Sequence, residues 1–296
     1  MKKVGNSFEL YATDLVGYLY CRHLMVLDRA VAEGALAKPK VWDPLLKILS
    51  QRGSAHERDY VEHLTAAGLD MVSINGIDVT VDAVGETLDA MRRGAAVIVQ
   101  GALSHQGWSG RADILRRVEA RSALGDWSYE AIDTKLARET KAGTILQLCL
   151  YSDLLGELQG LPPEYMHVVA PWTAFQPQQY RFADYAAYFR KVKRALALTM
   201  TEQALGDTYP DPIEHCDTCR WREACDMRRH DDDHLSLVAG ISKLQINELK
   251  ARGIGTVKSV ADMPLPLDWK PTRGSIDSYT RVREQGPASI VLVRGS

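Results

Sequence analysis

Two aspartates and a lysine near the middle of the chain are residue types that together suit a divalent metal ion. Asp113 lies in the segment GRADIL, and Asp133 and Lys135 lie in EAIDTK. Residues two apart in a strand share a face, so Asp133 and Lys135 point the same way, and Asp113 can lie opposite them on a neighbouring strand. Two carboxylates beside an ammonium predict a site for Mg²⁺ or Mn²⁺, which can activate water for attack on a phosphodiester.

The Asp-x-Lys spacing is common in proteins when taken alone. Its alternative interpretation is a surface ion pair at the end of a strand. Glu130 stands three residues before Asp133, on the opposite face of the same strand, and we do not count it as a ligand.

Cysteines form a second group with the spacing of metal ligands: Cys216, Cys219 and Cys225. A C-x-x-C step lets two thiolates bind one metal centre, and a fourth ligand is then needed. Cys21 would complete a Cys₄ iron–sulfur cluster, whereas a nearby histidine would complete a Cys₃His zinc site. The residues alone leave both interpretations open. The two histidines concerned are His215 and His230.

The elements that must position these residues follow from the apolar pattern. Three strands at 96–103, 110–118 and 127–135, joined by short polar or glycine-bearing links, predict an antiparallel meander. Thr13 and Thr140 are the predicted N-caps of a first helix and of a helix ending near residue 158. The other predicted elements are helices at 54–67, 82–91 and 184–205, strands at 71–74 and 165–170, and a linker at 206–214.

Composition limits the class of protein. The chain has 296 residues, of which 46% are hydrophobic and 25% charged, as in globular proteins of one or two domains. No apolar run is long enough to span a bilayer, and no apolar stretch follows the N-terminal lysines, so we expect a cytoplasmic protein without membrane contact. With 36 Lys and Arg against 38 Asp and Glu, any contact with nucleic acid must come from a local basic patch.

Four segments, taken in order, resemble the RecB-like branch of the PD-(D/E)XK nuclease superfamily. RGSAHE supplies a helical His56, GRADIL and EAIDTK supply the acidic residues and the lysine, and QLCLY supplies Gln147 and Tyr151. The resemblance covers about residues 10–226. It implies an α/β (α+β) fold with a restriction-endonuclease-like core, in which helices flank a central mixed sheet. It also implies a metal-dependent deoxyribonuclease, an exonuclease acting on DNA with single-stranded ends.

The resemblance also implies a role for each residue. His56, Asp113 and Asp133 would bind the metal, with the backbone carbonyl of Thr134 as a fourth ligand. Lys135 would be the catalytic lysine, and Gln147 and Tyr151 would shape the site and contact the DNA strand. Taken singly, His56 fits a surface histidine, Gln147 a solvated residue and Tyr151 a core aromatic. Asp133 stands where the superfamily's name places Glu, a usual variant from which we expect no loss of activity.

A further resemblance concerns the cysteines. AddB and the small CRISPR-associated exonucleases carry one N-terminal and three C-terminal cysteines, and LYCRH around Cys21 in the first helix resembles the N-terminal position. This implies a mainly structural [4Fe–4S] cluster on Cys21, Cys216, Cys219 and Cys225, closing the ends of the nuclease core. Cys149 is left to pack as a small apolar residue.

The C-terminal segment 235–262 predicts two short helices around glycine turns and resembles a helix–hairpin–helix unit. Gly240, Ile241 and Lys243 would then contact a DNA phosphate, as Arg111 would in the nuclease domain. The alternative is a plain helical hairpin that packs on the core. The predicted domains are therefore a nuclease domain at 1–230, the helical unit at 235–262, and a tail without strong pattern at 263–296.

A different class of function is a non-catalytic DNA-binding or assembly module of a repair or CRISPR-adaptation complex. The joint presence of Asp113, Asp133 and Lys135 argues against it, because a degenerate site has no physical need for these three residues together. A third interpretation is a nucleic-acid-binding protein that holds zinc and no iron.

Overall fold

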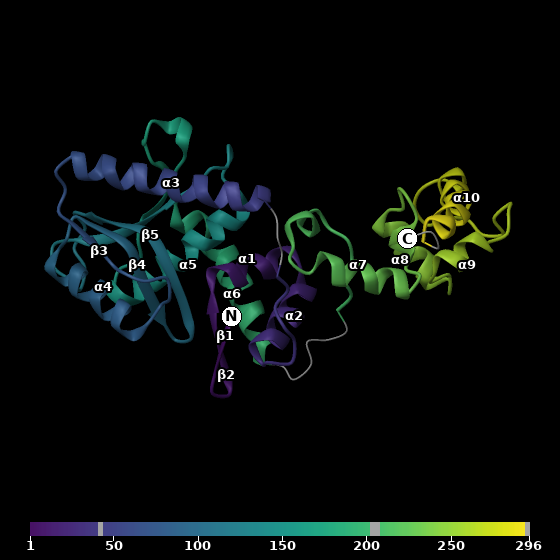
Figure 1. Cartoon of the computed structure of the whole chain (residues 1–296), viewed down its shortest axis with the longest axis horizontal. Helices are drawn as coiled ribbons and strands as arrows, with labels where there is room; N and C mark the ends of the chain where they lie inside the picture. Colours follow the sequence, from purple (N-terminus) through teal and green to yellow (C-terminus); the bar gives the residue numbers. More distant parts are fainter. Residues whose placement is uncertain (41–43, 202–207, 294–296) are drawn as a thin grey trace. The chain divides into compact units, whose positions relative to one another are not determined.

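The chain forms two compact units, Met1–Asp207 and Thr208–Ser296, in a computed structural model that describes residues 1–40, 44–201 and 208–293 (Figure 1). The three C-terminal cysteines belong to the second unit, whereas Cys21 belongs to the first. The boundary between the units thus precedes the cysteine group, while the sequence led us to expect it after residue 230.

The first unit is built on a mixed eight-stranded sheet. The meander β4–β5–β6 is antiparallel, as the sequence predicts, while β2·β5, β3·β4 and β6·β7 pair in parallel. Strand β5 is central, because it pairs with β4 along one edge and with β2 and β6 along the other. The strands are β1 (Lys2–Val4), β2 (Ser7–Tyr11), β3 (Met71–Ser73), β4 (Val97–His105), β5 (Trp108–Val118), β6 (Ser128–Thr134), β7 (Tyr165–Val169) and β8 (Gln178–Arg181).

Helices cover this sheet, which confirms the predicted fold class. Figure 1 shows α3 along one side of the strands and α4 on the other. Tyr60 and Leu64 of α3 pack on Val99, Ile114 and Ile132 of the sheet, and α5 packs against β4, β5 and β6. The helices of this unit are α1 (Ala12–Tyr20), α2 (Arg22–Ala32), α3 (Pro44–Ala66), α4 (Val81–Arg93), α5 (Ala142–Gln159), the 3₁₀ turn η1 (Pro171–Thr173) and α6 (Phe182–Thr201).

Some predicted boundaries were wrong. Helix α1 begins at Ala12, after Tyr11 as N-cap, so Thr13 is inside the helix and does not cap it. Cys21 lies outside any helix, in extended backbone between α1 and α2. Thr140 does not cap α5, since the N-cap is Lys141 and the Thr140 hydroxyl instead accepts a 2.7 Å hydrogen bond from Tyr180. Helix α3 begins ten residues earlier than predicted, at Pro44.

Strand β4 is irregular at Gln100, whose φ is +55°. A positive φ is uncommon for a residue other than glycine, and it marks local strain. The β4–β5 ladder pairs Val99 with Ile114 and Gly101 with Ala112, and it omits the position between them, where Gln100 faces Asp113.

The second unit is helical and has its own apolar core. Leu235, Val238, Leu249, Val260 and Tyr279 are all buried in it. The two predicted helices around glycine turns are present, and the predicted tail contains a further helix, α10. The elements are η2 (Glu214–Thr218), α7 (Arg222–Asp231), η3 (Leu235–Leu237), α8 (Lys243–Ala251), α9 (Val257–Ala261) and α10 (Ile276–Val293).

Candidate active site

Asp113 and Thr134 link the two central strands of the meander. One carboxylate oxygen of Asp113, Oδ2, accepts hydrogen bonds of 2.8 Å from both the backbone N–H and the hydroxyl of Thr134. The ladder pairs Ile114 with Ile132, so antiparallel register places Asp113 opposite Asp133 at the next position. Two donors on one oxygen fix the Asp113 side chain beside Asp133.

Asp133 is fully buried and is the centre of the site. Its Oδ1 accepts 3.0 Å hydrogen bonds from the Lys135 ammonium and from the Gln147 amide. Its Oδ2 accepts no hydrogen bond and has the Lys135 ammonium 2.8 Å away as an ion-pair partner. A buried carboxylate oxygen without a hydrogen bond is rare.

Burial raises the pKa of the Asp133 carboxyl to about 7, with the neighbouring charge of Asp113 as the second cause. The Lys135 ammonium lowers this pKa but does not outweigh the other two effects. The negative charge of Asp133 is therefore insufficiently compensated by the protein's own groups at neutral pH.

His56 lies beside this site on α3 and is buried. Its Nε2 is 3.1 Å from the carbonyl oxygen of Val169, which also accepts the Lys135 backbone N–H at 3.0 Å. Because a carbonyl oxygen only accepts, Nε2 carries the proton and the lone pair is on Nδ1. His56 is thereby tied to β7, and it is not grouped with the two aspartates in the present arrangement.

Glu57 is a residue of the site that the sequence interpretation missed. Its pKa is raised by burial and by the charge of Asp113, which places its carboxyl near the site. The Gln100 amide donates a hydrogen bond to it across to β4. Glu57 directly follows His56 in the sequence, but its place in the site depends on how α3 is rotated over the sheet.

Gln147 and Tyr151 form the wall of the site on α5. Gln147 Nε2 donates to Asp133 and, at 3.0 Å, to the Tyr151 hydroxyl, so both of its amide hydrogens are used. Tyr151 is buried, and burial raises its pKa, so the phenol is neutral. Gly110 on β5 makes room for this ring, because a Cβ there would lie 2.5 Å from a ring carbon of Tyr151.

Asp113 and Asp133 offer carboxylate oxygens, which are the ligands that a hard divalent cation such as Mg²⁺ prefers. The two carboxylates adjoin each other, and Oδ2 of Asp133 is an acceptor with no hydrogen bond. A cation there would supply the positive charge that Asp133 lacks. Over residues 1–40, 44–201 and 208–293, however, no three His, Cys, Asp or Glu side chains are placed as a complete set of metal ligands. Within these ranges, only the two aspartates are therefore placed as metal ligands would be. His56 and the Thr134 carbonyl stay predictions as ligands.

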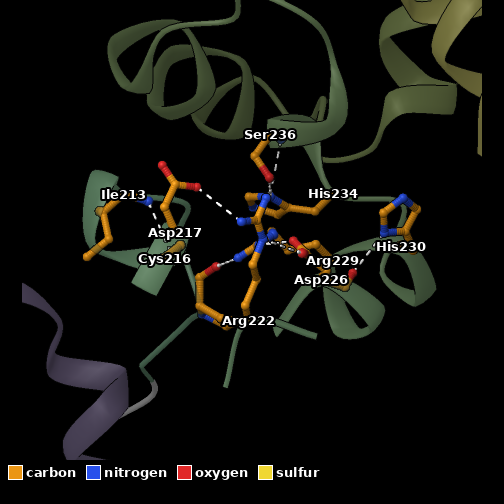
Figure 2. A network of polar contacts seen from close by, with 10 residues as sticks. Ile213, Cys216, Asp217, Arg222, Asp226, Arg229, His230, His234 and Ser236 are labelled. Atoms are coloured by element: carbon orange, nitrogen blue, oxygen red, sulfur yellow. Dashed lines mark hydrogen bonds and ion pairs between the residues drawn. The ribbon is translucent and has the colours of Figure 1, made fainter. Parts of the chain in front are cut away.

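The three C-terminal cysteines occupy one short segment of the second unit, and Figure 2 shows Cys216 among its polar neighbours. Cys216 is in η2, Cys219 ends that turn, and Cys225 is in α7. All three are outside disulfide bonds and partly exposed. The Cys216 Sγ accepts a 3.4 Å hydrogen bond from the backbone N–H of Ile213. Thiolates at this spacing are common metal ligands. Among the described residues, however, no three potential ligands lie close enough together to hold a metal ion.

Arginines make hydrogen bonds and ion pairs within this cysteine segment. Arg229 is buried, donates to the carbonyl of Pro210 and pairs with Asp226. Arg222 is half-exposed and pairs with Asp217, between Cys216 and Cys219, and with Asp226, next to Cys225, as Figure 2 shows. Exposed ion pairs contribute little to stability, so the buried Arg229 makes the main contact of this group.

The two histidines considered as zinc ligands differ. Burial lowers the pKa of His215, which favours the neutral ring that a metal needs. His230 Nδ1 is 2.8 Å from the carbonyl oxygen of Asp226, so Nδ1 carries the proton and the lone pair is on Nε2. His230 can thus present Nε2 to a metal.

The residues predicted to contact DNA belong to both units, with Arg111 in the first and Gly240, Ile241 and Lys243 in the second. The Arg111 guanidinium donates to the carbonyls of Ile74, Asn75 and Asp78, and it holds that loop. In the second unit, Gly240 has a φ of +71° and precedes α8, as a tight turn requires. Lys243, the first residue of α8, pairs with Asp211 at 3.3 Å.

A mixed sheet whose central strands bring two aspartates and a lysine together is the arrangement of restriction-endonuclease-like proteins. A family model described as the PD-(D/E)XK nuclease superfamily matches residues 23–226, and the chain belongs to this superfamily. No curated protein matches the chain. A solved structure described as the crystal structure of SSO0001 is similar over 77% of this chain and 89% of that chain, with 16% identity and a TM-score of 0.32. No described helix is long and apolar enough to cross a membrane.

Proposed function

We propose that the protein is a metal-dependent deoxyribonuclease that acts on DNA with single-stranded ends. The observation that carries this proposal is the buried Asp133 carboxylate. The positive charge of Lys135 does not offset the combined effect of burial and of the negative charge of Asp113 on this group. An inert binding module gains nothing from a buried carboxylate with a raised pKa, because burying a charge without compensation is costly. Membership of a nuclease superfamily supports the proposal independently.

A divalent cation bound at Asp113 and Asp133 would polarise the phosphodiester and lower the pKa of the attacking water. The chain's own groups supply the rest. Thr134 fixes the Asp113 carboxylate, and Gln147 fixes Asp133 with one amide hydrogen while it holds Tyr151 with the other. The Lys135 side chain is about one-third exposed, so its ammonium reaches both Asp133 and solvent. From there it positions water and stabilises negative charge as it develops on the phosphate.

The test is a nuclease assay on end-labelled single-stranded and duplex DNA with Mg²⁺ or Mn²⁺, on protein purified without oxygen. We expect Asp133→Ala and Lys135→Ala to abolish cleavage, and Asp153→Ala to leave it intact. Asp153 is a matched control because it also lies in an aspartate–lysine pair, with Lys193. If the native protein binds DNA but is as inert as the variants with every metal, the assembly-module interpretation replaces ours.

We also propose that Cys216, Cys219 and Cys225 bind a [4Fe–4S] cluster together with Cys21. The close spacing of the three thiols in the second unit and the partial exposure of Cys21 support this proposal. Zinc on the same three thiols with His215 or His230 is the alternative.

Metal analysis with Cys21→Ser separates the two sites. The cluster predicts a brown protein whose iron is lost in the variant. A Cys₃His zinc site predicts a colourless protein whose zinc content the variant keeps. The second result would refute the cluster.

A further inference from the structure

A hollow of about 400 Å³ lies between the α1–α2 junction and the middle of α6, all within the first unit. This volume is within the range of small-ligand pockets. The hollow is remote in sequence from the carboxylates. It adjoins the proposed cluster ligand Cys21, which stands between Tyr20 and Arg22 but is not part of the lining. Its lining consists of Tyr18, Leu19, Tyr20, Arg22, Tyr188, Lys191, Val192 and Ala195.

The lining combines aromatic rings with positive charge and contains no acidic side chain. Tyr188 is 53% exposed and Tyr20 is 38% exposed, high values for large aromatic side chains. The guanidinium of Arg22 lies over the ring of Tyr18, 5.6 Å from its centroid. Lys191 follows Tyr188 by three residues on α6, so both occupy one face of the helix.

This combination matches what single-stranded nucleic acid requires. Aromatic rings stack on bases of any sequence, and cations beside them neutralise the backbone phosphates. A duplex keeps its bases paired and stacked internally, so it offers no free base face to a tyrosine. An acidic ligand without rings would have no use for Tyr188, and an apolar one would have none for Arg22.

The hollow connects to the candidate active site through α5. Gly143 of α5 allows the close approach of α1, because a Cβ there would lie 3.0 Å from Val16 and 3.2 Å from the Tyr20 hydroxyl. Gln147, which holds Asp133, is one helical turn further along, a rise of about 6 Å. The helix that carries Gln147 thus also contacts Tyr20 of the hollow.

We propose that this hollow binds a base of a single-stranded DNA segment, stacked on Tyr188 and Tyr20, with Arg22 and Lys191 on the adjoining phosphates. The proposal rests on the proposed deoxyribonuclease function and places the single-stranded end of its substrate. It predicts selectivity for single strands at a position that does not take part in the chemistry.

The experiment measures the Kd of a short fluorescent oligothymidine by anisotropy in EDTA, so that binding is read without cleavage. Tyr188→Leu removes the ring and is expected to weaken binding about five- to 150-fold, the range for loss of one stacked base. Tyr188→Phe keeps the ring and is expected to stay within about twofold of the native protein. Tyr185→Leu is the matched control, because it removes a tyrosine of the same helix that is not part of the lining.

Duplex DNA of the same length is expected to bind the native and Tyr188→Leu proteins equally. The proposal is overturned if Tyr188→Leu binds the single strand like the native protein, if Tyr185→Leu weakens it as much, or if duplex binding falls in parallel. Cleavage is assayed separately with metal. A protein that binds single strands through Tyr188 but cuts no DNA would refute the proposed function and leave the hollow standing. A protein that cuts DNA but binds single strands equally well with Tyr188→Leu would refute the hollow and leave the proposed function standing.

Discussion

Replacing Asp133 by asparagine should stabilise the metal-free protein while it abolishes catalysis. The carboxyl has a folded-state pKa of about 7 against an ordinary value of 3.8. One unit of pKa corresponds to about 1.4 kcal/mol, so keeping this group ionised in the folded state costs up to about 4 kcal/mol at pH 8. Asparagine resembles the protonated carboxyl in shape and never ionises, so the variant avoids this cost.

The sign of the pH dependence follows from the direction of the shift. A carboxyl that holds its proton more tightly in the folded state stabilises the fold fully below the unfolded pKa, near 4, and this contribution is lost as the pH rises through 7. The free energy of unfolding of Asp133→Asn should therefore match the native value near pH 4 and exceed it increasingly up to pH 8.

Urea unfolding in EDTA across this pH range measures the difference. Asp89→Asn is the control, because Asp89 is an exposed carboxyl paired with Arg92 at 3.2 Å, and its loss should change stability by no more than about 1 kcal/mol. Adding Mg²⁺ should then stabilise the native protein and not the Asp133→Asn variant, by mass action on a site that only the native protein has. A variant less stable than the native protein at pH 8 in EDTA, or a difference independent of pH, would refute the electrostatic account of the site.

Three further predictions concern groups around the site. Gly110→Ala should displace the Tyr151 ring and reduce the rate of cleavage at least tenfold with little change in DNA affinity. Steady-state kinetics measures the rate and anisotropy the affinity, and an unchanged kcat would contradict the close packing of Gly110 and Tyr151. Arg111→Ala should make the 74–78 loop sensitive to protease while the sheet stays folded, and equal cleavage rates in limited proteolysis would show that its hydrogen bonds do not hold the loop. Glu130→Ala should cost about 3 kcal/mol in urea unfolding, because it leaves the buried His167 without its 2.7 Å partner, whereas a cost below 1 kcal/mol would argue against a strong pair.

The site residues that lie on strands were predictable because strand alternation is a strict rule. Asp133 and Lys135 had to share a face, and the meander order left Asp113 as their neighbour. The contributions of Glu57 and Val169 were not predictable in this way. Glu57 depends on how α3 is rotated over the sheet, and the Val169 carbonyl is backbone, which has no signature in the sequence.

The helix boundaries were less predictable for a related reason. Thr140 is a good N-cap by type, but its hydroxyl is used by Tyr180, a residue far along the chain, so the local preference gave way to a tertiary contact. The loop-holding role of Arg111 is equally non-local, because its acceptors are carbonyls of a loop more than thirty residues earlier. The last helix has a weakly amphipathic pattern, and it is Tyr279 and Val282 that join it to a core formed by other helices.

The irregular Gln100 in β4 has a mechanical consequence. The ladder to β5 is interrupted at the position that faces Asp113, so the hairpin consists of two rigid segments with a joint between them. Amide hydrogens on either side belong to the most buried strands of the protein and should exchange slowly, while the joint should exchange faster than its neighbours. Asp113 lies on β5 opposite this joint, while Thr134 of β6 holds its carboxylate from the other side. The aspartate is therefore anchored to β6, and the flexibility that we expect belongs to the β4 side of the site, where Gln100 contacts Glu57.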